Sequence, residues 1–283
     1  MRTAKPATAL RFIDIAWAGG QARIEHRWTG AARSLPGSAA PAPPLLVFLH
    51  EGLGSVSMWR DFPEQLCAAL GCRGLVYSRP GYGQSTPRPS GERWAPDFMH
   101  RQAYEVLPAL LQALGVDTAA QPPWLLGHSD GGSIALLHAA RFSGGPTPRV
   151  AGAIVMAAHI SVENIAITSI AGARVAYTAG ELKAGLARHH KDPDSAFWGW
   201  NDAWLSPAFR HWDIRAELPS IVCPLLALQG VDDEYGTLAQ LHGIAAQVPQ
   251  TQLLELSACG HSPHRDQPQK VMAEVRAFMA GQG

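Results

Sequence analysis

Hydrophobic and polar residues along the chain follow two alternating patterns, which predicts strands interleaved with helices. Residues 45–50, LLVFLH, are apolar on both faces, as is typical of a strand covered by helices on both sides. Further strands are predicted at 74–80, 124–129, 150–159, 224–230 and 252–256. Helices are predicted between or after them at 57–70, 97–115, 130–142, 237–248 and 268–280. This alternation predicts an α/β fold with a mostly parallel, doubly wound sheet.

Three segments depart from the alternation. Residues 10–30 alternate around a central Gly-Gly pair and predict an N-terminal hairpin, and the Pro- and Ala-rich stretch 34–44 predicts a loop. Residues 160–218 are helical in character and carry four of the nine tryptophans within fifteen residues. Because open α/β sheets bind ligands at the carboxyl ends of their strands, we interpret 160–218 as a helical cap over that edge. The core is then 1–159 and 219–283.

Composition narrows the possible partners and compartments. The chain has 283 residues, of which 47% are hydrophobic and 16% charged, which favours one large domain with a substantial core. Lys and Arg balance Asp and Glu at 23 each, and without a basic run we expect no nucleic-acid partner. The four cysteines lack CxxC spacing and suggest buried thiols in a reducing compartment. With no apolar signal region and no membrane-spanning run, we expect a cytoplasmic protein without membrane contact.

The candidate chemistry centres on Ser129. Residues 127–131, GHSDG, fit G-x-S-x-G, a sharp strand-to-helix turn that exposes a serine hydroxyl, and a strand and a helix flank it as required. A serine is a weak nucleophile unless a base takes its proton and a carboxylate orients the base. Asp232 and Asp233 follow one predicted strand, and His261 follows the last. The order Ser, Asp, His is the order that enzymes with this turn use.

Donors for a developing oxyanion are predicted from two loops. One is the backbone N–H of Asp130, the residue after the serine, and the other comes from the loop HEGLGS at 50–55. In that loop Gly52 is the preferred donor by position, with Leu53 as the alternative.

Together, the motifs FLHEGLGS, YSRPGYGQS, LLGHSDGGSIAL, LALQGVDDEYG and CGHSPHRDQP resemble the α/β-hydrolase superfamily in order and over nearly the whole chain. The resemblance implies an α/β-hydrolase fold with a serine triad of Ser129, Asp233 and His261. The family usually places its acid three residues after the glycine that ends the strand, here Gly230, so Asp233 is preferred and Asp232 is the fallback.

The sequence departs from the family pattern beside both oxyanion donors. The common His-Gly pair is His50-Glu51 here, and a carboxylate beside an oxyanion is unfavourable. Glu51 is therefore expected to point away, to pair with a cation or to be partly protonated. The Asp130 side chain either caps the following helix, which we favour, or receives a substrate ammonium, as the resemblance to hydrolases of amino-acid esters implies. We interpret His50 and His128 as structural and His189-His190 as part of a solvated loop.

These features predict a serine-dependent hydrolase that cleaves a small carboxylic ester or related acyl compound through an acyl-enzyme. Hydrolysis of a C–C bond in a ring-cleavage diketone is the alternative, and a small-molecule receptor on the same fold is a third possibility. Trp198, Trp200 and Glu51 are the candidate substrate contacts. We expect no cofactor and no metal, since His261 and His264 have no third ligand at useful spacing.

Overall fold

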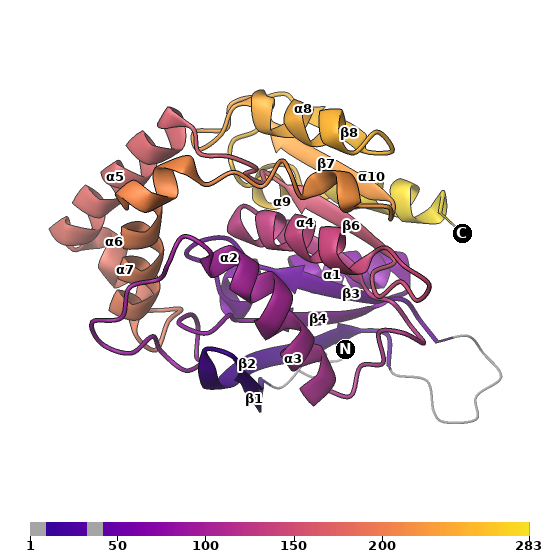
Figure 1. Cartoon of the computed structure of the whole chain (residues 1–283), viewed down its shortest axis with the longest axis horizontal. Coiled ribbons are helices and arrows are strands. Elements are labelled where there is room, and N and C mark those ends of the chain that lie inside the picture. Colours follow the sequence, from indigo (N-terminus) through magenta and orange to yellow (C-terminus); the bar gives the residue numbers. More distant parts are fainter. Residues whose placement is uncertain (1–9, 33–41, 283) are drawn as a thin grey trace, which may run out of the picture.

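The computed structural model describes residues 10–32 and 42–282, and its centre is an eight-stranded sheet (Figure 1). The strands are β1 (Arg11–Trp17), β2 (Gly20–Gly30), β3 (Leu45–Leu49), β4 (Arg73–Tyr77), β5 (Trp124–His128), β6 (Gly152–Met156), β7 (Leu225–Gly230) and β8 (Gln252–Leu256). Their order is β1-β2-β4-β3-β5-β6-β7-β8. The β1–β2 hairpin joins β4 antiparallel, and the other neighbours are parallel. The predicted hairpin and parallel sheet are confirmed. Most of the predicted 34–44 loop lies outside the described residues.

Helices cover both faces of the sheet because the central strands are apolar on both sides. Every residue of β3, β5, β6 and β7 is buried. Along β3, Leu46 and Phe48 pack with α1 (Phe62–Leu70) and α10 (Pro268–Ala280). Leu45, Val47 and Leu49 belong to the opposite cluster, with α3 (Leu107–Ala113), α4 (Asp130–Phe142) and α8 (Leu238–Gln247). The result is a three-layer arrangement whose loops at the carboxyl edge are free to carry a site.

Two predicted helices are interrupted. The segment 97–115 divides into α2 (Phe98–Arg101), a π-helical turn (Gln102–Val106) and α3. Pro108 has no N–H to donate to the preceding turn, and the wider π turn accommodates that loss. The segment 57–70 divides into a 3₁₀ turn (Val56–Trp59) and α1, because Arg60 between them is left-handed with φ 54°.

The insertion between β6 and β7 is helical. It comprises α5 (Asn164–Ala179), α6 (Glu181–Leu186), α7 (Pro193–Trp204) and 3₁₀ turns at Pro207–His211 and Leu218–Ser220. Figure 1 shows α5, α6 and α7 together at the left edge of the sheet. His190 is not solvated as expected: it is buried, its Nδ1 accepts from Gly83 N–H at 2.9 Å, and its Nε2 donates to the Leu53 carbonyl at 3.0 Å. The insertion is thus tied to the loop after β3. The exact domain boundaries stay a prediction.

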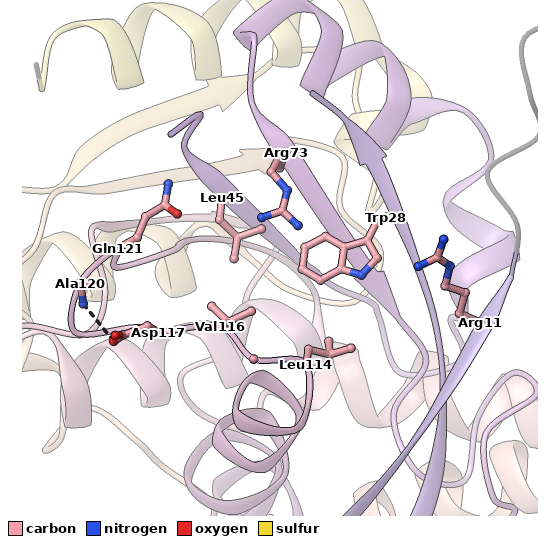
Figure 2. A pocket seen from close by; sticks show the side chains of 10 residues that line it. Arg11, Trp28, Leu45, Arg73, Leu114, Val116, Asp117, Ala120 and Gln121 are labelled. Carbon is pink, nitrogen blue, oxygen red and sulfur yellow. Dashed lines mark hydrogen bonds between the residues drawn. The ribbon is translucent and has the colours of Figure 1, made fainter. Parts of the chain in front are cut away.

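A cavity of about 480 Å³ lies near the amino end of β3, where Trp28, Leu45 and Leu114 form part of its wall (Figure 2). Its one carboxylate, Asp117, accepts hydrogen bonds from the N–H groups of Ala119 and Ala120. Parallel sheets carry their sites at the carboxyl ends of the strands, which is the edge opposite this cavity. A short α9 (Pro263–Asp266) follows the loop after β8 there. Within the described part of the chain, no helix has the length and apolarity to cross a membrane.

Candidate active site

Ser129 occupies a strained turn between β5 and α4. Its backbone has φ 54° and ψ −121°, a sparsely populated conformation for a residue with a side chain. Both flanking glycines are required by space: a Cβ on Gly127 would lie 2.1 Å from the Gly131 carbonyl oxygen, and one on Gly131 would lie 2.1 Å from that of Leu49. The sequence GHSDG therefore folds into a tight elbow that holds the serine hydroxyl at the carboxyl edge of the sheet.

The structure brings the three predicted residues together. His261 Nε2 lies 2.9 Å from Ser129 Oγ, and His261 Nδ1 lies 2.8 Å from Asp233 Oδ1. Asp233 is buried, whereas the fallback Asp232 is exposed. The arrangement can pass a proton from the serine to the histidine while the carboxylate orients the ring.

Asp233 is held as a carboxylate by donors on several sides. Burial raises the pKa of Asp233, but the hydrogen bonds with His261 and the Tyr235 N–H outweigh burial and leave the pKa below its ordinary value. Gln229 Nε2 donates to the second oxygen at 3.2 Å. An ionised Asp233 accepts the Nδ1 proton of His261, so Nε2 is left to accept the hydroxyl proton of Ser129.

The two predicted oxyanion donors are available. Asp130 is the first residue of α4, where a backbone N–H has no partner within the helix. Among the described residues, neither this N–H nor that of Gly52 donates to a protein group. Gly52 is covered by the insertion, since a Cβ there would lie 2.2 Å from Trp200 Nε1. Trp200 thus lies against the loop that carries Gly52, and its role as a substrate contact stays a prediction.

The close approach of Trp200 to Gly52 leads to a test. Gly52→Ala is expected to lower kcat about 100-fold, because the methyl group displaces either the loop or the indole, and displacements of about 1 Å have effects of this size. Adding Trp200→Ala makes room for the methyl group and is expected to restore part of kcat. Steady-state kinetics of both variants and of Trp200→Ala alone check this; an unaffected kcat in the single Gly52→Ala variant would contradict it.

Comparison with known proteins decides the family. The chain matches the alpha/beta hydrolase family over residues 46–275, a span that includes Ser129, Asp233 and His261. The chain belongs to the α/β-hydrolase family.

Similar structures support the fold of this α/β hydrolase. A thermophilic esterase from Thermogutta terrifontis superposes with a TM-score of 0.68 at 22% identity, over 96% of this chain and 99% of that one. An enol-lactonase from Burkholderia xenovorans LB400 gives a TM-score of 0.69 at 19% identity, over 94% and 99%. In sequence, a 2-succinyl-6-hydroxy-2,4-cyclohexadiene-1-carboxylate synthase from Salmonella agona (strain SL483) is 30% identical over 133 residues. That match covers 47% of this chain and 45% of the synthase, less than half of either.

In this α/β hydrolase the unusual Glu51 is paired with the cation Arg265 and lies beside His128. Its Oε1 lies 3.2 Å from Arg265 Nη2, and its Oε2 lies 3.6 Å from His128 Nδ1. His128 Nε2 faces the His261 carbonyl at 2.7 Å and must donate to it. Burial raises the pKa of Glu51, but His128 and Arg265 outweigh burial and hold the pKa well below its usual range. Of the three expected outcomes for Glu51, cation pairing is the one found.

The pairing of Glu51 predicts a pH-dependent contribution to stability. A depressed carboxyl pKa stabilises the fold above the ordinary pKa of roughly 4.3, and this stabilisation is lost as pH falls below it. Glu51→Gln is expected to lower the unfolding free energy by about 2 kcal/mol at pH 7, and the deficit should shrink below pH ~4. Urea unfolding between pH 7 and 3 measures this, with Glu255→Gln in the exposed His242–Glu255 pair as the control. A deficit independent of pH would contradict it.

The Asp130 side chain does not cap α4, so the favoured interpretation was wrong. Ser129 occupies the N-cap position without a side-chain cap bond. Instead, Asp130 Oδ1 accepts from Trp204 Nε1 at 3.1 Å, and Oδ2 lies 3.8 Å from Arg79 Nη1. Burial raises the pKa of Asp130, and Arg79 and Trp204 oppose that shift. The cation beside Asp130 is therefore the protein's own Arg79, where a substrate ammonium had been considered.

Of the two tryptophans predicted as substrate contacts, Trp200 lies against the loop that carries Gly52, and a third tryptophan of the insertion was not predicted. Trp198 packs against Tyr177 and Phe197, with ring centroids 5.5 and 5.0 Å away. Trp204, not singled out before, binds Asp130 and packs on His159 at 5.0 Å. The cluster of tryptophans was the available signal, but which ring turns inward depends on the path of α7.

Two further rings near His261 were also missed. The Tyr235 ring lies 4.6 Å from that of His261, and the His159 ring lies 6.0 Å away. Burial, reinforced by His261, lowers the pKa of His159 to about 3, so this imidazole is neutral beside the site. Each residue lies just after the carboxyl end of a strand, β7 or β6, and this position was the signal in the sequence.

Proposed function

We propose that this α/β hydrolase cleaves a small carboxylic ester or a related acyl compound through an acyl-enzyme on Ser129. The observation that carries the proposal is the continuous chain Ser129–His261–Asp233, with contacts of 2.9 and 2.8 Å, beside two available backbone N–H groups. This set of groups is what acyl transfer requires: a nucleophile, a base, an orienting carboxylate and oxyanion donors.

The proposed reaction has two halves. Ser129 Oγ attacks the substrate carbonyl carbon while His261 Nε2 takes the hydroxyl proton, and Asp233 stabilises the imidazolium. The oxyanion accepts hydrogen bonds from the N–H groups of Gly52 and Asp130. Collapse of the intermediate breaks the bond to the leaving group, which takes the proton from His261. Water then adds to the acyl-enzyme with His261 as base, which releases the carboxylic acid and restores Ser129.

The surroundings favour a neutral, apolar acyl group of modest size. The charged groups nearest the elbow are already paired within the protein, Asp130 with Arg79 and Glu51 with Arg265. Trp200 covers the oxyanion loop from the insertion, and aromatic walls bind apolar surface well. The names of the structural neighbours, an esterase and an enol-lactonase, agree with an ester or lactone as substrate.

A second candidate is hydrolysis of a C–C bond in a ring-cleavage diketone. The partial match to the 2-succinyl-6-hydroxy-2,4-cyclohexadiene-1-carboxylate synthase is the reason to retain this second candidate, because the name of that relative is not that of an esterase. The same serine, histidine and acid would serve either reaction, so only substrate comparison separates the two.

A fluorophosphonate probe and a substrate panel test the proposal together. We expect the probe to modify Ser129, located by peptide mass spectrometry, and p-nitrophenyl esters of short acyl chains to turn over. Rapid cleavage of a ring-cleavage diketone with slow ester turnover would favour the second candidate. Reversible binding of small molecules with neither labelling nor turnover would indicate a receptor and overturn the proposal.

A further inference from the structure

Arg79 is a fully buried arginine just after β4, and it has no role in the proposed reaction steps. Its exposure is 0%, which is rare for a guanidinium unless it is paired. The Tyr82 ring lies beneath it, 4.6 Å from the guanidinium carbon to the ring centroid. The contacts of its backbone N–H and of its guanidinium nitrogens indicate what this residue holds in place.

Arg79 fixes the peptide unit that carries the Gly52 donor. The Glu51 carbonyl oxygen accepts from Arg79 Nη2 at 2.8 Å, from His50 Nδ1 at 2.7 Å and from Gly54 N at 3.1 Å. In a planar trans peptide the C=O and the following N–H point in opposite directions. Three donors on the Glu51 oxygen therefore set the direction of the Gly52 N–H.

His50 transmits a second constraint from Arg79. Its Nε2 accepts from the Arg79 backbone N–H at 3.0 Å, so the ring proton is on Nδ1 and is donated to the Glu51 oxygen. Burial, reinforced by the Arg79 charge, lowers the pKa of His50 well below its usual range, which keeps this tautomer neutral. The strand-end histidine thus acts through the same carbonyl as the arginine.

A second guanidinium nitrogen, Nη1, faces the other donor residue. Arg79 Nη1 lies 3.8 Å from Asp130 Oδ2, and the described residues offer neither atom a hydrogen-bond partner. Asp130 contributes the second oxyanion N–H through its backbone, and Trp204 holds its other carboxylate oxygen. The Arg79 guanidinium therefore faces both the peptide that carries the Gly52 N–H and the side chain of Asp130.

We infer that Arg79 is the positioning residue of the oxyanion hole: it holds the Glu51 carbonyl and the Asp130 carboxylate so that the N–H groups of Gly52 and Asp130 converge. This inference rests on the proposed function. It also explains how glutamate can stand at position 51, where the family commonly has glycine. The peptide between Glu51 and Gly52 is oriented through the Glu51 carbonyl oxygen, and the Glu51 side chain takes no part in this. Arg79 contacts no reacting atom, so its removal should affect the transition state and spare ground-state binding.

Two Arg79 variants test the inference on the full chain. Arg79→Met/Asp130→Asn removes both buried charges and so avoids an unpaired carboxylate; kcat for a p-nitrophenyl ester is expected to fall about 100-fold with KM within about threefold. Arg79→Lys, which retains a donor, is expected to recover part of kcat. Inhibition by a trifluoromethyl ketone, whose adduct with Ser129 carries the oxyanion, should weaken by the same factor as kcat/KM, a change that a general loss of rigidity does not predict.

Matched controls separate the outcomes. Asp130→Asn alone keeps the Arg79 bond to the Glu51 carbonyl, and its kcat is expected to fall by less than that of Arg79→Met/Asp130→Asn. Like Arg79, Arg27 pairs with a carboxylate, that of Glu64, and donates to a loop carbonyl, that of Arg60. Arg27→Met should leave kcat unchanged. A folded Arg79→Met/Asp130→Asn variant with wild-type kcat and ketone affinity would overturn the inference alone. Wild-type protein without turnover or fluorophosphonate labelling would overturn the proposed function, and this inference with it.

Discussion

Replacing Ser129 by alanine is expected to lower kcat for p-nitrophenyl esters by a factor of about 10⁴ or more without unfolding the protein. The substitution removes the atom that is proposed to form the acyl bond, and loss of the nucleophile in serine hydrolases leaves only catalysis by binding and oxyanion stabilisation. The backbone of the elbow is held by Gly127, Gly131 and the bond from the Ser129 N–H to the Met156 carbonyl at 2.9 Å. None of these contacts involves the hydroxyl. Turnover assays with thermal unfolding measure both parts of the expectation.

Ser133 provides the control for Ser129. It lies one turn further along α4 and is also buried, but its hydroxyl donates to the His159 carbonyl at 2.6 Å and not to His261. Ser133→Ala is expected to cost about 1 kcal/mol of unfolding free energy and to keep kcat within about tenfold. Near wild-type turnover by Ser129→Ala would refute the acyl-enzyme, and an equal loss in Ser133→Ala would show that packing of α4, not the nucleophile, had been disturbed.

The sequence predicted those parts of the site that depend on local constraints. Ser129 is set by glycines two residues away, and Asp233 and His261 each follow a strand that was predicted from its apolar residues. Parallel strands bring such residues to one edge wherever they occur in the chain. The hairpin, the mostly parallel sheet and the helical insertion were predicted from the same patterns.

The partners of the charged residues could not be predicted in this way. Arg265 is 214 positions from Glu51, and Trp204 is 74 positions from Asp130. Nothing in the local pattern around Asp130 indicates that Trp204 will reach it, so capping was the natural but incorrect interpretation. The prediction of one continuous helix over 97–115 was wrong for a related reason. Pro108 removes a backbone hydrogen bond to the preceding turn, and the apolar periodicity of the segment does not show this loss.

Asp233→Asn is the second substitution with a large expected effect, a fall in kcat of about 10⁴-fold. An amide beside His261 Nδ1 can donate to it, which favours the tautomer with the proton on Nε2; that nitrogen can then no longer accept the proton of Ser129. The charge that stabilises the imidazolium is lost as well. Because the pKa of Asp233 is depressed, the variant should also have a lower free energy of unfolding than wild type above pH ~4. This difference in unfolding free energy should vanish as pH falls further.

Asp232→Asn is the matched control, one position away and exposed. It should leave kcat within about threefold and the stability profile unchanged, since exposed carboxylates contribute little. Comparing kcat and urea unfolding of the two variants between pH 7 and 3 decides which acid orients His261. A larger loss of kcat in Asp232→Asn than in Asp233→Asn would mean that the loop after β7 rearranges in the working enzyme and that the 2.8 Å contact between Asp233 and His261 is not the one used.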